Sequence, residues 1–325
     1  MKWNLTIALC FLLVTVIARA QGDVDTYVPV TDNQTTNTYA VIIANEHYEF
    51  EVSVPYALND GVIFKRYLEK TLGVPEKNIK YVPDASLNKM RRNLQWLRDM
   101  VSVAGDSVRA IVYYSGHGMP DEASHKAYLL PVDGYSTDTR SGVGTEELYK
   151  LLGEMRTAQT LVFLDACFSG AKREGGMMQK ARGVAIKSKQ IPVMVSNMVV
   201  FSAATGDETA WPLKDKEHGL FTYCVLEQLH ESNGCISLGD LSDKVAAKVM
   251  RVSMSDNGKM QTPTVTAPEG SREWRNWMMI AEPAKRYEVM PKAQLEESMG
   301  NASESKKDDT DNKPKPKSFL RKRNQ

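Results

Sequence analysis

The stretch AIVYYSGHG at residues 110–118 and its counterpart LVFLDACFSG at residues 161–170 decide the fold of this chain. Each begins with an apolar run typical of a buried strand and ends at a reactive residue close to glycine, His117 in the first and Cys167 in the second. In an open α/β sheet, ligands bind beyond the carboxyl ends of the strands. If the two predicted strands are neighbours, both side chains face one crevice, and a cysteine beside a histidine is the minimum equipment for thiolate catalysis.

The segments around these two stretches alternate between strand and helix patterns. Strands are predicted at residues 39–44, 79–82, 109–114, 160–164, 198–203 and 262–266, with part of a small hairpin at residues 128–131. Helices are predicted at residues 58–72, 87–103, 145–155, 220–230 and 238–254. This alternation predicts an α/β fold, a mostly parallel sheet with helices on both faces.

The composition is that of an ordinary soluble globular protein, with 42% hydrophobic and 25% charged residues. The net charge of +1 gives no reason to expect nucleic acid or an anionic membrane as partner.

The first twenty residues have the form of a signal peptide. Lys2 supplies a positive start, residues 5–17 are mostly apolar, and Ala18-Arg19-Ala20 has the small-x-small form of a cleavage site. The apolar run is short for a membrane span, so an uncleaved anchor is the weaker interpretation. Residues 1–20 are therefore predicted to be removed, and the mature protein to be secreted or periplasmic with no stable membrane anchor.

The four cysteines include Cys10, which lies in the predicted signal peptide. Removal of that segment leaves Cys167, Cys224 and Cys235, an odd number, so one thiol stays free or pairs between chains. Cys224 sits in an apolar helical run and is predicted to pack in the core. The histidines and cysteines lack metal-ligand spacing, and no metal site is predicted.

Composition divides the rest of the chain. Residues 21–38 are polar and are predicted to form an extended arm, and residues 39–295 the folded domain. Residues 171–190 form a basic, glycine-containing linker within that domain. Residues 296–325 are too polar to bury enough surface to fold alone and are predicted to be a disordered basic tail.

YYSGHG and DACFSG resemble the two signature motifs of the caspase-like cysteine peptidases, and are most similar to the metacaspases and their bacterial relatives. The resemblance extends from about Tyr39 to about Val265. It implies a caspase-like sandwich of about six strands, with a large part at residues 39–170 and a small part at residues 191–295. It also implies a cysteine endopeptidase that acts on protein or peptide substrates.

Two other functions fit the same fold. A clostripain- or gingipain-like peptidase would share both the fold and a preference for basic residues. A catalytically silent scaffold would need neither His117 nor Cys167, so the presence of both argues against it.

Peptidase chemistry assigns a role to each motif. Cys167 is predicted to attack as a thiolate, and His117 to protonate the leaving amine and later activate water. The backbone N–H groups of Gly118 and Cys167 are the predicted donors to the tetrahedral oxyanion. No third catalytic side chain is predicted.

Acidic residues near the motifs predict the specificity. Asp165 lies two residues before Cys167, and Asp60 lies where the first predicted helix begins. A strand-end hydrogen bond and a helix N-cap are the structural alternatives for these two residues. By the resemblance, Asp60, Asp165 and Ser115 match positions that line the pocket for the residue before the cut bond, which predicts cleavage after Arg or Lys.

Two features concern activators and cofactors. Ala57 stands where metacaspases commonly have a cysteine, which removes a thiol from the pocket but not its charge. The sequence requires no cofactor. The resemblance leaves calcium as a candidate activator, but Asp133, Glu146 and Glu147 form no compact oxygen-ligand loop, so no calcium ligands are assigned.

The basic linker predicts self-processing. An enzyme that cuts after Arg or Lys finds its own preferred residues at Lys172, Arg173, Lys180, Arg182, Lys187 and Lys189. A merely solvated basic loop is the alternative.

Overall fold

The computed structural model describes residues 23–121, 124, 126–168, 171–172, 176–177, 197–206, 208–268, 270–295 and 297. The predicted signal peptide lies outside these residues, as do most of the linker at residues 171–190 and almost all of the tail. In the part of the chain that is described, no helix combines the length and the apolar character needed to cross a bilayer.

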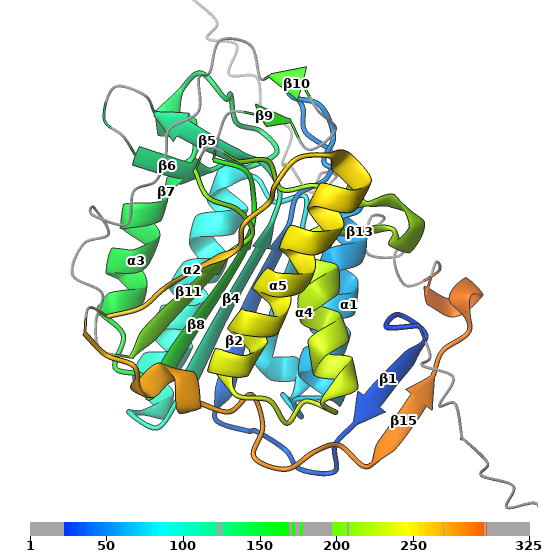
Figure 1. Ribbon diagram of the computed structural model, residues 1–325. Helices are drawn as coiled ribbons and strands as arrows, with labels where there is room; N and C mark the ends of the chain where they lie inside the picture. Colours follow the sequence, from blue (N-terminus) through cyan, green and yellow to red (C-terminus); the bar gives the residue numbers. More distant parts are fainter. Residues whose placement is uncertain are drawn as a thin grey trace, which may run out of the picture.

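The centre of the molecule is a six-stranded sheet (Figure 1). Its strands are β2 (Thr38–Ala44), β3 (Ile79–Pro83), β4 (Arg109–Ser115), β8 (Gln159–Asp165), β11 (Met198–Ser202) and β14 (Thr264–Thr266). They lie in the order β14-β11-β8-β4-β2-β3, and only the β11–β14 pair of this sheet is antiparallel. The predicted α/β class and mostly parallel sheet are confirmed.

Helices cover both faces of this sheet (Figure 1). They are α1 (Ala57–Lys70), α2 (Leu87–Ala104), α3 (Thr145–Gly153), α4 (Leu220–Glu231) and α5 (Leu238–Asn257). Side chains of α1, α4 and α5 share one apolar core with alternate strand residues such as Ile42, and those of α2 and α3 share the other core with the intervening residues such as Ile43. This follows from strand geometry, in which successive side chains point to opposite faces.

Local sequence explains where the helices begin and which side they bury. The side chain of Ser86 accepts a hydrogen bond from the backbone N–H of Lys89 and caps α2, and Ser237 caps α5 in the same way. The buried residues of α2 recur every three or four positions, which places them on one side of the helix: Met90, Leu94, Leu97 and Val101.

Smaller sheets surround this centre. β5 (Gly118–Asp121), β6 (Lys126–Leu129) and β7 (Val143–Gly144) form a three-stranded sheet where the sequence predicts a small hairpin. Three two-stranded pairs join β9 (Ala171–Lys172) to β10 (Gly176–Met177), β12 (Pro212–Leu213) to β13 (His218–Gly219), and β1 (Tyr27–Val30) to β15 (Arg286–Val289). The β1–β15 pair links the segment predicted as an extended arm to the end of the folded domain, a pairing that no local pattern indicates.

Candidate active site

His117 and Cys167 lie just beyond the ends of two adjacent parallel strands. β4 and β8 pair in register, with Ser115 opposite Asp165, and each reactive residue follows its strand end by two positions. The backbone N–H of Gly116 donates to the carbonyl of Asp165 at 3.2 Å, so the two chains stay side by side past the strands. Both side chains are buried, with 3% exposure for His117 and 6% for Cys167. The strand register thus places both at one level of the sheet edge.

The loop between β2 and α1 orients His117. The backbone N–H of His117 donates to the hydroxyl of Tyr48 at 2.7 Å, and the Tyr48 ring packs 4.7 Å from the imidazole centroid. The imidazole Nε2 lies 2.8 Å from the carbonyl oxygen of Val52. A carbonyl only accepts, so Nε2 carries the proton, and Nδ1 is left as the ring nitrogen that can accept one. The sequence carries no signal for this contact because every residue has a carbonyl.

Cys167 is held by the chain that follows β11. The backbone N–H of Ala210 donates to the Cys167 sulfur at 2.7 Å, and the Ala210 carbonyl, 3.6 Å from the sulfur, accepts from the thiol when it is protonated. A donor aimed at sulfur stabilises negative charge there, which is the form in which a cysteine attacks.

Gly118 is packed against the chain that carries Cys167. A Cβ at this position would lie 2.4 Å from the carbonyl oxygen of Cys167 and 2.6 Å from the ring of Phe168. Only glycine therefore fits at this position, directly against the backbone of the residue that carries the thiol. The oxyanion role of its N–H stays a prediction.

We expect Gly118→Ala to lower kcat/KM by about a hundredfold, since a displacement on the order of 1 Å at a catalytic centre has that effect. Overpacking is also expected to lower the free energy of unfolding by about 1–3 kcal/mol. Gly144→Ala is the matched control, because a Cβ there meets only ordinary contacts of 3.5 Å or more. Steady-state kinetics and thermal unfolding check both variants, and wild-type kinetics in Gly118→Ala would contradict the assigned position.

The carboxylate of Asp60 is fully buried in a polar cluster. It accepts from the Ser115 hydroxyl at 3.1 Å, from the backbone N–H of Gly219 at 3.0 Å, and from His218 Nδ1 at 2.8 Å. The other imidazole nitrogen, Nε2, lies 2.7 Å from the carboxylate of Asp25. Burial alone would lower the pKa of His218, but the two carboxylates raise it to about 10. The imidazole is therefore a cation between two anions, an arrangement that no local motif predicts.

Asp165 lies on the other side of Ser115 and is 1% exposed. Its carboxylate accepts from Thr222 through both the hydroxyl at 2.6 Å and the backbone N–H at 3.2 Å. Gly219 is the N-cap residue of α4, so both carboxylates receive N–H groups from the start of this helix. The partial positive charge of a helix N-terminus stabilises such anions.

The structure thus brings all the predicted site residues to one edge of the sheet. Ser115 joins the acidic residues, since it bonds to Asp60 and stands opposite Asp165. Neither carboxylate reaches the surface, and their charge is partly offset by His218 and by the N-terminus of α4. The sequence missed His218, although it stands directly before the glycine that opens an apolar helix.

Each of the acidic residues considered for calcium is bonded to a different group of the protein. Asp133 accepts the backbone N–H of Leu87, whereas Glu146 pairs with Lys126 and Glu147 with Arg91. Across the described ranges, no group of three or more His, Cys, Asp or Glu side chains is placed to hold a metal ion. These residues do not fit a calcium site, and no step of the mechanism is assigned to one.

Comparison with known proteins agrees with this geometry. The family model of the caspase domain matches residues 37–272, close to the range over which the motifs resemble that family. Among solved structures, caspase-1 from Spodoptera frugiperda aligns with a TM-score of 0.53 and 16% identity, over 73% of this chain and 90% of that one. A structural-genomics protein from Geobacter sulfurreducens aligns with a TM-score of 0.56 and 13% identity, over 77% of this chain and 100% of that one. At these identities the likeness shows the fold alone.

A curated protein of a different kind also matches part of the chain. The chaperone protein HtpG of Ehrlichia ruminantium is 26% identical over 146 residues, which is 43% of this chain. The match spans only 23% of the length of that relative. No residue role is carried over from it.

Proposed function

The chain belongs to the caspase-domain family, and from this premise we propose that it is a cysteine endopeptidase that cuts peptide bonds after Arg or Lys. The observation that supports the proposal best is the register of β4 and β8, which carries His117 and Cys167 to one edge of the sheet. The acidic residues beside them support the preference for a basic substrate residue.

In the proposed mechanism, the Cys167 thiolate attacks the carbonyl carbon of the scissile bond and forms a tetrahedral intermediate. The N–H groups of Gly118 and Cys167 stabilise the oxyanion. His117 gives a proton to the leaving amine as the C–N bond breaks, which leaves an acyl-enzyme. The same imidazole then takes a proton from water, the hydroxide attacks the acyl carbon, and the carboxylic acid leaves as the thiolate is regenerated.

The preference for Arg or Lys is proposed from the charge of the pocket. Asp165 and Asp60 are buried on either side of Ser115, where a low dielectric strengthens their attraction for a cation. An Arg or Lys side chain that reaches these carboxylates would meet this negative potential.

Export is proposed from residues 1–20, which lie outside the described residues. The mature protein would then act on protein or peptide substrates either in the periplasm or outside the cell.

A peptide-library digest with the mature protein tests the proposed activity. Cleavage after Arg and Lys is expected, and the same digest with and without calcium measures any activation. Preferred cleavage after Asp would refute the proposed specificity. Comparing the N-terminal sequence of the exported protein with Gln21 tests the signal peptide.

Labelling with a thiol probe distinguishes a peptidase from a silent scaffold. The chain has three free cysteines among the described residues, of which Cys224 is buried in the core and Cys235 is partly exposed. A peptidase is expected to label at Cys167 faster than at Cys235 despite the burial of Cys167. Equal or slower labelling of Cys167 would favour the scaffold.

Self-processing in the basic linker is a further proposal. Of the six basic residues at issue, only Lys172 is described, as part of β9. Intact mass after incubation is expected to show wild-type fragments that end in Lys or Arg of residues 171–190, with none in Cys167→Ala. Cutting of both proteins would point to an outside protease. An intact wild-type chain that still digests peptides would mean that the linker is only a solvated loop.

A further inference from the structure

The segment ahead of β1 places a carboxylate close to the candidate pocket, which is defined by Asp60, Ser115 and Asp165. Asp25 lies in this segment, and its Oδ1 is 2.7 Å from His218 Nε2. Its backbone carbonyl accepts from Arg66 of α1 at 2.7 Å, and the carbonyl of the preceding Val24 accepts from the Tyr67 hydroxyl at 3.0 Å. The position of Asp25 is therefore fixed by α1, the helix that also carries Asp60.

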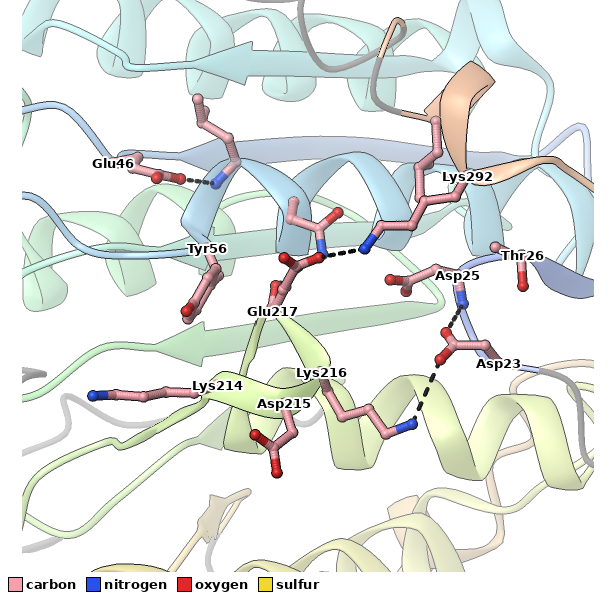
Figure 2. A pocket seen from close by; sticks show the side chains of 13 residues that line it. Asp23, Asp25, Thr26, Glu46, Tyr56, Lys214, Asp215, Lys216, Glu217 and Lys292 are labelled. Atoms are coloured by element: carbon pink, nitrogen blue, oxygen red, sulfur yellow. Dashed lines mark hydrogen bonds and ion pairs between the residues drawn. The ribbon is translucent and has the colours of Figure 1, made fainter.

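His218 connects Asp25 to Asp60 through the protein interior. His218 and Asp60 are both 0% exposed, whereas the Asp25 side chain is 15% exposed. Asp25 lines a cavity of about 700 Å³, together with Asp23, Lys216 and Glu217 (Figure 2). Asp25 is thus the solvent-facing end of a buried chain of charges that ends under Ser115.

The charges around this imidazole can be named element by element. They comprise Asp25 from the N-terminal segment, Asp60 from α1, Lys216 and Glu217 from the chain leading into β13, and the Tyr223 ring of α4 at 5.9 Å between centroids. Lys216 is paired with Asp23, and Glu217 with Lys292 (Figure 2). Asp25 and Asp60 are the two carboxylates in direct contact with the ring.

The sum of these charges decides what a substrate meets. A protonated His218 with Asp60 alone is neutral, and such a pair offers a cationic substrate little attraction. With Asp25 on the second nitrogen, the three groups together carry one negative charge. We propose that Asp25 is a positioning residue of the candidate pocket, which balances His218 so that Asp60 keeps its attraction for an Arg side chain. This inference rests on the proposed function.

The pH dependence of KM separates this role from a purely structural one. Asp25→Asn removes one carboxylate from His218 and so lowers the pKa of the imidazole. Below that lowered pKa, His218 is charged and cancels Asp60. Above it, His218 is neutral, keeps its Nδ1 proton on Asp60, and leaves the pocket negative again. A structural defect has no reason to reverse with pH.

The test compares wild type, Asp25→Asn and Asp23→Asn on a peptide cut after Arg, a residue that stays charged throughout. At about pH 6, KM of Asp25→Asn is expected to be about tenfold above wild type and to approach it by about pH 9, with kcat little changed. Asp23→Asn is the matched control. It removes the carboxylate that pairs with Lys216 at 3.5 Å in the same cavity, and an asparagine Oδ1 can still accept the Asp25 N–H that Asp23 accepts at 3.0 Å. Its KM is expected to stay at the wild-type value at every pH.

A second measurement does not need activity. The NMR resonances of the His218 imidazole are recorded in Cys167→Ala and assigned by comparison with His218→Gln. They are expected to show a protonated ring up to about pH 9. When Asp25→Asn is added, the ring is expected to lose its proton at lower pH. An unchanged KM in Asp25→Asn, or one raised equally at all pH values, would overturn the inference. A wild type that cuts no Arg peptide refutes the proposed function instead. If Asp25→Asn does not fold, the Cys167→Ala protein with Asp25 in place still tests the inference: a neutral His218 at about pH 7 in that protein would overturn it without affecting the proposed function.

Discussion

Cys167→Ala is expected to abolish peptidase activity, with kcat reduced by at least about four orders of magnitude, because no other group can form the acyl-enzyme. His117→Ala is expected to have an effect of similar size, since the Cys167 thiol then loses the group that accepts its proton, and the leaving amine loses its proton donor. Both residues follow their strands at matching positions of the β4–β8 register, which is the basis for treating them as one unit. The double variant is expected to be no slower than either single variant.

The measurement is hydrolysis of an Arg-containing peptide, with thermal unfolding as the check on folding. The substitution Cys167→Ala removes only the sulfur of a small buried side chain, so this variant is expected to unfold at nearly the wild-type temperature. Cys235→Ala is the matched control, a partly exposed thiol whose loss should leave kcat unchanged. Activity of either site variant within a few-fold of wild type would rule out the mechanism.

The two buried aspartates are expected to respond differently to neutralisation. Asp165→Asn is expected to lower kcat/KM for Arg and Lys peptides by about two to three orders of magnitude, the usual effect of truncating a buried charge pair. The expected loss of substrate binding is smaller for Asp60→Asn, because His218 already offsets part of that charge. Stability should show the reverse order. Asp60→Asn leaves the His218 cation with Asp25 alone and is expected to lower the free energy of unfolding by about 3 kcal/mol.

Kinetics on paired peptides that differ only in Arg or Asp before the cut bond, together with denaturant unfolding, check this order. Asp99→Asn on the exposed side of α2 is the control for loss of a remote carboxylate. If both variants keep wild-type kcat/KM for Arg, the specificity lies elsewhere. The two carboxylates then serve only as buried acceptors, Asp60 for His218 and Gly219 and Asp165 for Thr222. The N-cap of α1 is Tyr56, so Asp60 does not cap that helix.

Local patterns in the sequence determine the layers of this fold. The core strands begin and end within two residues of the prediction because an apolar run bounded by turn residues is a local signal. The two motifs at the ends of β4 and β8 also determine the candidate reactive residues, since parallel strands of one sheet present their carboxyl ends at the same edge.

The tertiary structure alone decides how the buried charges are paired. His218 lies 158 residues from Asp60 and 193 from Asp25 along the chain, and it bonds to both. The same holds for β1 and β15, whose strands pair from the two ends of the described chain. Hydrophobic periodicity repeats within a few residues and can be recognised from sequence alone. The role of a buried carboxylate depends on the hydrogen-bond donors that the completed fold places around it. Because those donors come from distant parts of the chain, the residues next to the carboxylate in sequence do not indicate them.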